Sequence, residues 1–106
     1  MRVFIDACVD PRVAGLLQQH EVACAHELGW QDLQDHVLLP RLLGRFDVLI
    51  TTDQGIEFEH NLTKLRFGIV IVHVAKNKVE FYQPLTSKLL IAIEEVEPGT
   101  VIHVRG

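Results

Sequence analysis

The amino-acid sequence predicts one α/β domain, a three-layer α/β/α sandwich built on a mainly parallel β-sheet. Short apolar runs that are typical of buried strands alternate along the chain with segments of helical periodicity. Strands separated by helices form βαβ units, whose right-handed crossovers keep the strands parallel and place helices on both faces. The 106 residues suffice for a single hydrophobic core, so residues 1–106 are predicted to form one domain.

Five strands are expected, each a short run rich in apolar residues. They comprise residues 2–6, 21–25, 48–52, 67–74 and 101–104, the last at an edge of the sheet. After the first strand, Asp10 is a potential N-cap and Pro11 suits the first helical position, which predicts a helix that runs to about His20. Gly29 then indicates a loop over residues 26–30.

The remaining helices are predicted from punctuating residues and apolar stripes. A second helix should begin between Asp32 and Asp35 and end at Gly44, with a kink or an early end at Pro40. Residues 55–62 favour a short helix. Pro84 can start a final helix, in which Leu85, Leu89, Ile93 and Val96 form an apolar stripe and which the sequence Glu97-Pro98-Gly99 ends.

Composition restricts the possible partners and the cellular compartment. A net charge of −4 argues against a protein that holds nucleic acid by bulk positive charge, but it is compatible with a nuclease whose acids bind a metal ion. No apolar run is long enough to span a membrane and the N-terminus lacks a signal-peptide pattern, so a cytoplasmic location is expected. Cys8 and Cys24 are then expected to be reduced thiols.

Two acidic residues stand where predicted strands end. Asp6 follows the first strand and Asp53 follows the third. Because chemistry in open α/β sheets gathers beyond the carboxyl ends of the strands, both residues should face one crevice, where paired carboxylates favour a divalent cation. Thr51 and Thr52 are candidates to orient a carboxylate or contact phosphate. Candidates for a third acidic ligand are Asp35, Asp32, Glu27, Glu57 and Glu59.

Structural roles compete with this interpretation. Asp6 or Asp53 alone could close a turn, and Asp32 or Asp35 could cap a helix. The six histidines show no HxH or HExxH spacing, and no GxGxxG, P-loop or GxSxG motif occurs, so zinc-protease, dinucleotide-binding, Walker ATPase and serine-hydrolase sites of those types are not indicated.

Several segments resemble small prokaryotic PIN-like proteins, a family described as toxin components of type II toxin–antitoxin systems. The similarity covers about residues 2–74 and is carried by Phe4-Ile5-Asp6, His20-Glu21-Val22, Glu27-Leu28-Gly29-Trp30, Phe46-Asp47-Val48-Leu49-Ile50-Thr51-Thr52-Asp53 and Asn61-Leu62. The resemblance implies a PIN-type sandwich in which Mg²⁺ or Mn²⁺, held by clustered acids, hydrolyses RNA phosphodiesters. By position, Asp6, Asp35 and Asp53 match the family's catalytic and metal-binding acids.

The sequence departs from this family pattern at three positions. Ala7 and Cys8 stand where members often have an acid and an amide, and Gly55 stands where many have Asp or Asn. Glu57 is a candidate to compensate if the chain folds back toward the crevice. The departures also suit an alternative function, a binding or dimerisation module that has lost catalytic acids.

A receiver-like phosphoacceptor domain is a more remote alternative. It calls for paired acids after the first strand and a lysine well downstream of the phosphoacceptor, whereas Asp6 stands alone and Lys76 follows Asp53 closely. The expected partners are RNA, an antitoxin protein and a second copy of the chain. Phe81, Tyr82 and Leu39 are candidates for the apolar surface of a homodimer, and the mean hydropathy of +0.20 favours such a surface.

Overall fold

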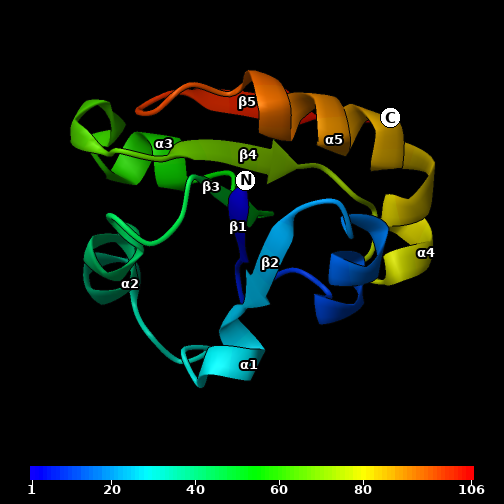
Figure 1. Ribbon diagram of the computed structural model, residues 1–106, viewed down its shortest axis with the longest axis horizontal. Coiled ribbons are helices and arrows are strands. Elements are labelled where there is room, and N and C mark those ends of the chain that lie inside the picture. Colours follow the sequence, from blue (N-terminus) through cyan, green and yellow to red (C-terminus); the bar gives the residue numbers. More distant parts are fainter.

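The computed structural model describes all residues from Met1 to Gly106, and its five strands form one sheet in which all neighbours are parallel. The strands are β1 (Arg2–Ile5), β2 (Glu21–Cys24), β3 (Val48–Thr51), β4 (Gly68–Val72) and β5 (Val101–Val104). Their order is β2-β1-β3-β4-β5 (Figure 1). The predicted α/β fold is confirmed. Strands β3 and β4 are buried along their whole length, which explains their continuous apolar sequences.

Helices pack on both faces of the sheet. They are α1 (Ala25–Leu28), α2 (Asp35–Leu42), α3 (Ile56–Glu59), α4 (Val79–Tyr82) and α5 (Thr86–Glu95), with the short 3₁₀ helices η1 (Pro11–Leu16), η2 (Leu62–Lys64) and η3 (Gln83–Leu85). Strand side chains alternate between two cores, one packed against η1 and α5 and the other against α2 and α3. Figure 1 shows α2 and α5 on different sides of the sheet. The sheet is therefore the middle layer.

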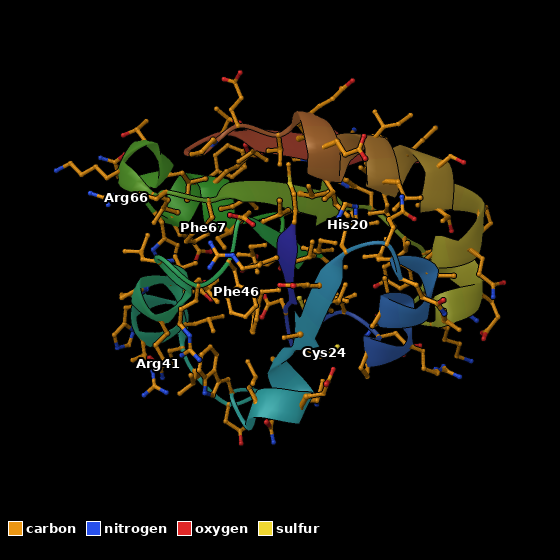
Figure 2. The ribbon with its side chains drawn as sticks, in the orientation of Figure 1. His20, Cys24, Arg41, Phe46, Arg66 and Phe67 are labelled. Atoms are coloured by element: carbon orange, nitrogen blue, oxygen red, sulfur yellow. The ribbon has the colours of Figure 1, made fainter.

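Two aromatic and two basic side chains show how the side of the molecule that carries α2 is built. Phe67 belongs to the core beneath α2 and α3, and Phe46 packs against that core (Figure 2). Arg41 and Arg66 are exposed at the outer surface of the same side (Figure 2). The layer under α2 and α3 is thus apolar inside, and its outer surface carries these two arginines.

Two helical predictions need correction. The helix expected from Pro11 to about His20 is the six-residue η1, which ends at Leu16. Asp10 caps it as predicted, but the exposed Gly15 weakens helix propensity near its end. The loop expected over residues 26–30 contains most of the one-turn helix α1, and Gly29 adopts the left-handed conformation that ends it, with φ of 71°.

The other three helical predictions hold in outline. The short helix expected over residues 55–62 is α3, which spans Ile56–Glu59. Helix α2 lies within the predicted limits, with Pro40 in its last turn. Its N-cap is Gln34, so neither Asp32 nor Asp35 caps it, and the carboxylate of Asp35 is available to other partners. The final helix, α5, is preceded by the separate short elements α4 and η3, which the sequence did not predict.

Two of the three residues expected on an apolar surface are buried. Tyr82 has 0% of its surface exposed and Leu39 has 6%, because each packs into one of the two cores. Their prediction as dimer contacts is therefore wrong, and only Phe81, which is 39% exposed, remains of that set. None of the helices has the length and apolar character needed to cross a bilayer.

Candidate functional site

The alternation of side chains along β1 and β3 brings Asp6 and Thr51 together. Phe4 and Leu49 point into the core beneath α2 and α3, and the residues two positions further along project on the same face, at the carboxyl edge of the sheet. The hydroxyl of Thr51 donates to Oδ2 of Asp6 at 2.9 Å. Thr51 is fully buried, so this bond fixes the Asp6 carboxylate.

Thr51 also joins Asp6 to Asp53. The backbone N–H of Asp53 donates to Oγ1 of Thr51 at 3.1 Å, and Oδ1 of Asp53 accepts from the backbone N–H of Gly55 at 2.9 Å. The second contact closes a tight turn of the kind that aspartate favours after a strand. Asp6 and Asp53 thus lie at the carboxyl ends of two neighbouring strands, linked through one hydroxyl.

Further contacts engage the Asp6 carboxylate within its own loop. Oδ1 accepts from the backbone N–H of Ala7 at 2.8 Å, and Oδ2 accepts from Sγ of Cys8 at 3.6 Å. The hydroxyl of Thr52 donates to the carbonyl of Cys8 at 3.3 Å, so Thr52 holds the loop rather than facing Asp6. These contacts hold the loop after β1 in place at the edge of the sheet, but they use part of the hydrogen-bonding capacity of the Asp6 carboxylate.

Gly55 leaves space that the carboxylate of Glu59 occupies. A Cβ atom at position 55 would lie 2.6 Å from Oε1 of Glu59 and 3.3 Å from Oδ1 of Asp53. Both carboxylates therefore border the position where a side chain at residue 55 would begin. Glu59, not the predicted Glu57, is the acid that approaches this position.

Asp35 reaches the same helix from α2. Its Oδ2 lies 3.3 Å from Nε2 of His60, and one ligand atom each from Asp35, Glu59 and His60 lie within 4.8 Å of one another. Asp35 was predicted from the sequence, whereas His60 was not, because its partner lies on another element. The exposed acids Asp32 and Glu27 form no hydrogen bond with these residues.

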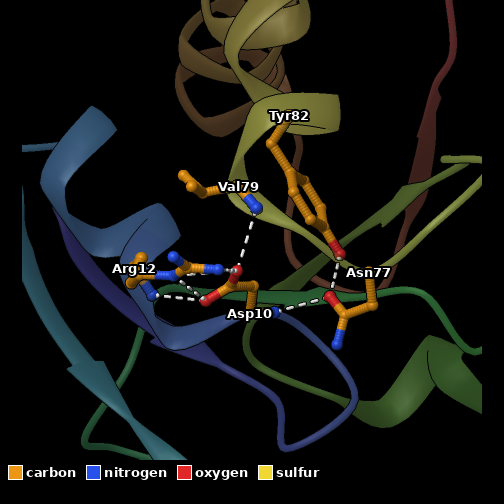
Figure 3. Close-up of polar contacts among 5 residues, drawn as sticks. All are labelled: Asp10, Arg12, Asn77, Val79 and Tyr82. Carbon is orange, nitrogen blue, oxygen red and sulfur yellow. Dashed lines mark hydrogen bonds and ion pairs between the residues drawn. The ribbon is translucent and has the colours of Figure 1, made fainter.

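Asp10, next to this edge, has a structural role instead. Its carboxylate is 6% exposed and accepts from the backbone and side chain of Arg12 and from the backbone N–H of Val79 at 2.9 Å (Figure 3). The side-chain hydrogen bonds from Arg12 are the main cause that lowers its pKa to about 2. Asn77 completes the network, accepting from the Asp10 backbone and from the hydroxyl of Tyr82, both at 2.7 Å.

Two groups of polar side chains thus lie at the carboxyl edge: Asp6 and Asp53, linked through Thr51, and Asp35, Glu59 and His60, whose ligand atoms lie within 4.8 Å of one another. The turn at Gly55, which borders the carboxylates of both Asp53 and Glu59, connects them, whereas no contact joins Asp6 to Asp35. Carboxylate oxygens with one imidazole nitrogen can hold a divalent cation. Comparisons of the chain with protein-family models, with curated proteins and with solved structures found no match.

Proposed function

We propose that this protein is a divalent-metal-dependent ribonuclease that hydrolyses RNA phosphodiesters, with Asp6, Asp35 and Asp53 as its catalytic acids and Glu59 as a fourth. One observation carries the proposal: Asp35 and Glu59, from helices on different segments of the chain, converge with His60 within 4.8 Å, and Glu59 shares the Gly55 turn with Asp53. Carboxylates gathered this closely repel each other unless a cation or proton joins them.

The donor set fits a metal ion. Asp35 and Glu59 supply oxygen and His60 supplies nitrogen, a mixture that suits Mn²⁺ better than Mg²⁺, which prefers oxygen ligands alone. A bound ion would lower the pKa of a water molecule and offset charge on the phosphate. The positions of Asp6 and Asp53 at the same edge suit them to complete the shell directly or through water.

The other residues of the edge position these acids. Thr51, buried and bonded to both Asp6 and the Asp53 backbone, sets the separation of the two strand ends. Thr52 holds the Cys8 loop, which keeps that loop close to β3. No side-chain nucleophile is required for hydrolysis by water, so the proposal needs no reactive role for Cys8.

The resemblance to PIN-like toxins extends the proposal to partners. The substrate would be RNA, and an antitoxin protein would silence the enzyme by covering the site. Phe58 lies between Glu57 and Glu59 in α3 and is 84% exposed, an unusual exposure for a large apolar side chain beside a polar site. It is the residue that we expect a bound antitoxin to cover.

A catalytically depleted binding module is the second candidate. The engagement of the Asp6 carboxylate by Ala7, Cys8 and Thr51 favours it, because a ligand that is satisfied by its own loop binds a metal ion less readily. The two functions differ in a simple respect. Only the nuclease needs an ion at Asp35, Glu59 and Asp53.

The test combines RNA cleavage with calorimetry of Mn²⁺ binding. We expect the wild-type protein to cut fluorescent RNA only when Mn²⁺ or Mg²⁺ is added, and Asp53→Asn and Asp35→Asn to lower the rate about 100-fold, a typical effect of removing a preorganised electrostatic group. Asp32→Asn, at an exposed acid outside the cluster, is the matched control and should be unchanged. If the wild type neither cuts RNA nor binds Mn²⁺, the binding-module function replaces the nuclease.

A further inference from the structure

A second polar cluster lies at the same edge of the sheet, on the side of β4 and β5. Nε2 of His103 lies 2.7 Å from Oε1 of Glu57, and Nδ1 of His103 lies 2.8 Å from Nε2 of His73. Nη2 of Arg105 lies 3.3 Å from the same nitrogen of His73. Four side chains from α3, the end of β4 and the end of β5 thus form a continuous chain of hydrogen bonds.

Strand alternation explains why these histidines meet. Ile69 and Ile71 of β4 point into the core beneath α2 and α3, and Val101 of β5 packs against that core. His73 and His103 each come two residues further along their strands, so they project on the same face as Asp6 and Thr51. The acids follow β1 and β3, His73 follows β4 and His103 lies in β5, so the two clusters follow neighbouring strands of the sheet.

Helix α3 connects the two clusters. Glu57 and Glu59 are two residues apart, which places them on opposite sides of a helical turn. Glu57 bonds to His103, whereas Glu59 approaches Asp35 and His60. One short helix therefore supplies a carboxylate to each cluster, and the buried Ile56 anchors it to the core.

Arg105 and Glu57, the side chains at the two ends of this row of hydrogen bonds, fix the direction in which the hydrogen bonds run. Arg105 can only donate, so Nε2 of His73 accepts and its proton lies on Nδ1. Nδ1 of His103 then donates to His73, and Nε2 of His103 donates to the carboxylate of Glu57. In this direction of the hydrogen bonds, both ring nitrogens of His103 act as donors and Nε2 of His73 acts as the acceptor. Burial and the positive charges of Arg105 and His103 lower the pKa of His73, in agreement with this assignment.

The same contacts argue against a metal ion at this cluster. Binding an ion through His73 Nε2 would bring a second positive charge beside the guanidinium of Arg105, which repels it. A carboxylate that accepts from one imidazole, which in turn donates to a second imidazole, is an arrangement for proton transfer, comparable to the way an acid orients the histidine of a catalytic triad.

We propose that Glu57, His103 and His73 form a proton relay in which Nδ1 of His73 protonates the leaving oxygen of the phosphodiester. This inference rests on the proposed ribonuclease function. As the phosphorus–oxygen bond to the leaving group breaks, its electron pair goes to that oxygen, which takes the proton from His73 Nδ1. The proton on His103 Nδ1 moves to His73 Nε2, while Nε2 of His103 still donates to Glu57. Water that attacks phosphorus forms the new bond and loses its proton to solvent, which later reprotonates the relay.

The roles in the relay are distinct. His73 is the catalytic residue, because it alone touches the reacting oxygen. His103 and Glu57 are positioning residues that act through it. If the leaving group needs no proton, the rate of cleavage should no longer depend on His73, His103 or Glu57. This difference provides the test.

The first experiment compares two RNA substrates, one ordinary and one in which sulfur replaces the leaving oxygen at the scissile bond. Thiolate leaves without protonation, so we expect His73→Gln to slow the ordinary substrate about 100-fold and the sulfur substrate less than about threefold. Glu57→Gln, which is nearly isosteric, should show the same selectivity with a smaller loss. Asp53→Asn should slow both substrates alike.

The outcomes separate the relay from the nuclease function. Equal losses of His73→Gln on both substrates would overturn the relay and leave the ribonuclease intact. Failure of the wild type to cut either substrate would overturn the ribonuclease and, with it, the proton-transfer step.

A second measurement examines the protonation pattern in the metal-free protein. Nitrogen-15 NMR of the imidazoles should show two protonated ring nitrogens in His103, and in His73 a protonated Nδ1 with an unprotonated Nε2. Glu57→Gln should remove one proton from His103. A proton on Nε2 of His73 in the wild type would mean that His73 donates to His103 instead of accepting from it, and this would overturn the relay.

Discussion

At the level of single residues, Gly55 has a larger effect than its size suggests. A side chain there would meet the carboxylate of Glu59 at 2.6 Å, so the glycine lets an acid from α3 approach Asp53. The space that a side chain at residue 55 would take is thus occupied by an acid four residues later.

We predict that Gly55→Ala weakens Mn²⁺ binding about tenfold, a loss in the range seen when the shell around a metal ligand is disturbed. The added methyl group displaces Glu59 from its position beside Asp53. Because the clashing atom is the end of a flexible, exposed side chain, the free energy of unfolding should change by less than about 1 kcal/mol. Isothermal calorimetry and urea unfolding measure the two effects.

Gly15→Ala is the matched control for this substitution, because Gly15 has no atom within 4 Å of an added Cβ and lies in η1. It should leave Mn²⁺ affinity unchanged. If Gly55→Ala also binds Mn²⁺ like the wild type, Glu59 is not a ligand, and the site loses one of its acids.

Sequence reasoning located some of the site residues and missed others for a definable reason. The positions of Asp6 and Asp53 follow from where two apolar runs end, which is a local signal. The meeting of Asp35 with His60, and of His73 with His103, depends on which strands are neighbours and on residue alternation across several strands. Neither contact joins residues that form a short motif in the sequence, so the sequence alone shows the histidines only as isolated residues.

At the level of elements, Asp10 joins two segments that are distant in sequence. Its carboxylate caps η1 through Arg12 and also accepts from the first residue of α4, Val79. This bond ties the loop after β1 to the loop after β4, on the opposite side of the carboxyl edge from α2.

We predict that Asp10→Asn lowers the free energy of unfolding by about 1 to 2 kcal/mol at pH 7. The folded state holds the pKa of Asp10 at about 2 instead of 3.8, and part of that advantage is discounted because Arg12 is exposed to solvent. Since the pKa is lowered on folding, the stabilisation is present above pH 3.8 and is lost as the pH falls toward 2. Urea unfolding across this range should show wild type and variant converging.

Asp47→Asn is the control for a partly exposed ion pair. Asp47 binds Arg2 with both side chains more than 40% exposed, so its loss should cost only about 0.5 kcal/mol. Equal effects of the two substitutions would mean that the buried network around Asp10 contributes nothing beyond a surface pair.

The strands were easier to predict than the helices for a physical reason. Each strand is a run of buried residues whose apolar character is set by the core, so its sequence signal is strong. Elements such as α1 and α4 have only four residues each, too few to show a helical period, and their position is set by tertiary packing.

At the level of the whole molecule, the strand order places the site. The order β2-β1-β3-β4-β5 changes direction between β1 and β3, and open α/β sheets bind ligands outside the carboxyl ends of strands at such a point. Asp6 and Asp53 follow these two strands. The sequence predicted a shared edge, but the neighbouring position of β4, which places His73 at the end of the next strand along this edge, required the fold.

The sheet also ends in an open edge that suits pairing with a second copy. Strand β5 has no neighbour on its outer side, so its outward backbone groups are unpaired. A groove beside it is lined by residues of α5, of β5 and by Arg105. Half of them are apolar, including Ile91 and Ile102, and the other half are polar or charged: Lys88, Glu95, His103 and Arg105. Ile91 is 54% exposed. This surface replaces the one that Tyr82 and Leu39 were expected to form.

We predict a homodimer that pairs through β5 and α5, with twice the 12.0 kDa mass of the chain in multi-angle light scattering at micromolar concentration. Ile91→Glu should convert it to a monomer, because a charge would be buried where an apolar side chain now lies exposed for contact. Leu28→Glu, at a comparably exposed apolar residue of α1, should leave the mass unchanged. If the wild type is a monomer, the open edge of β5 is protected in some other way, and the exposed Ile91 has no role in self-association.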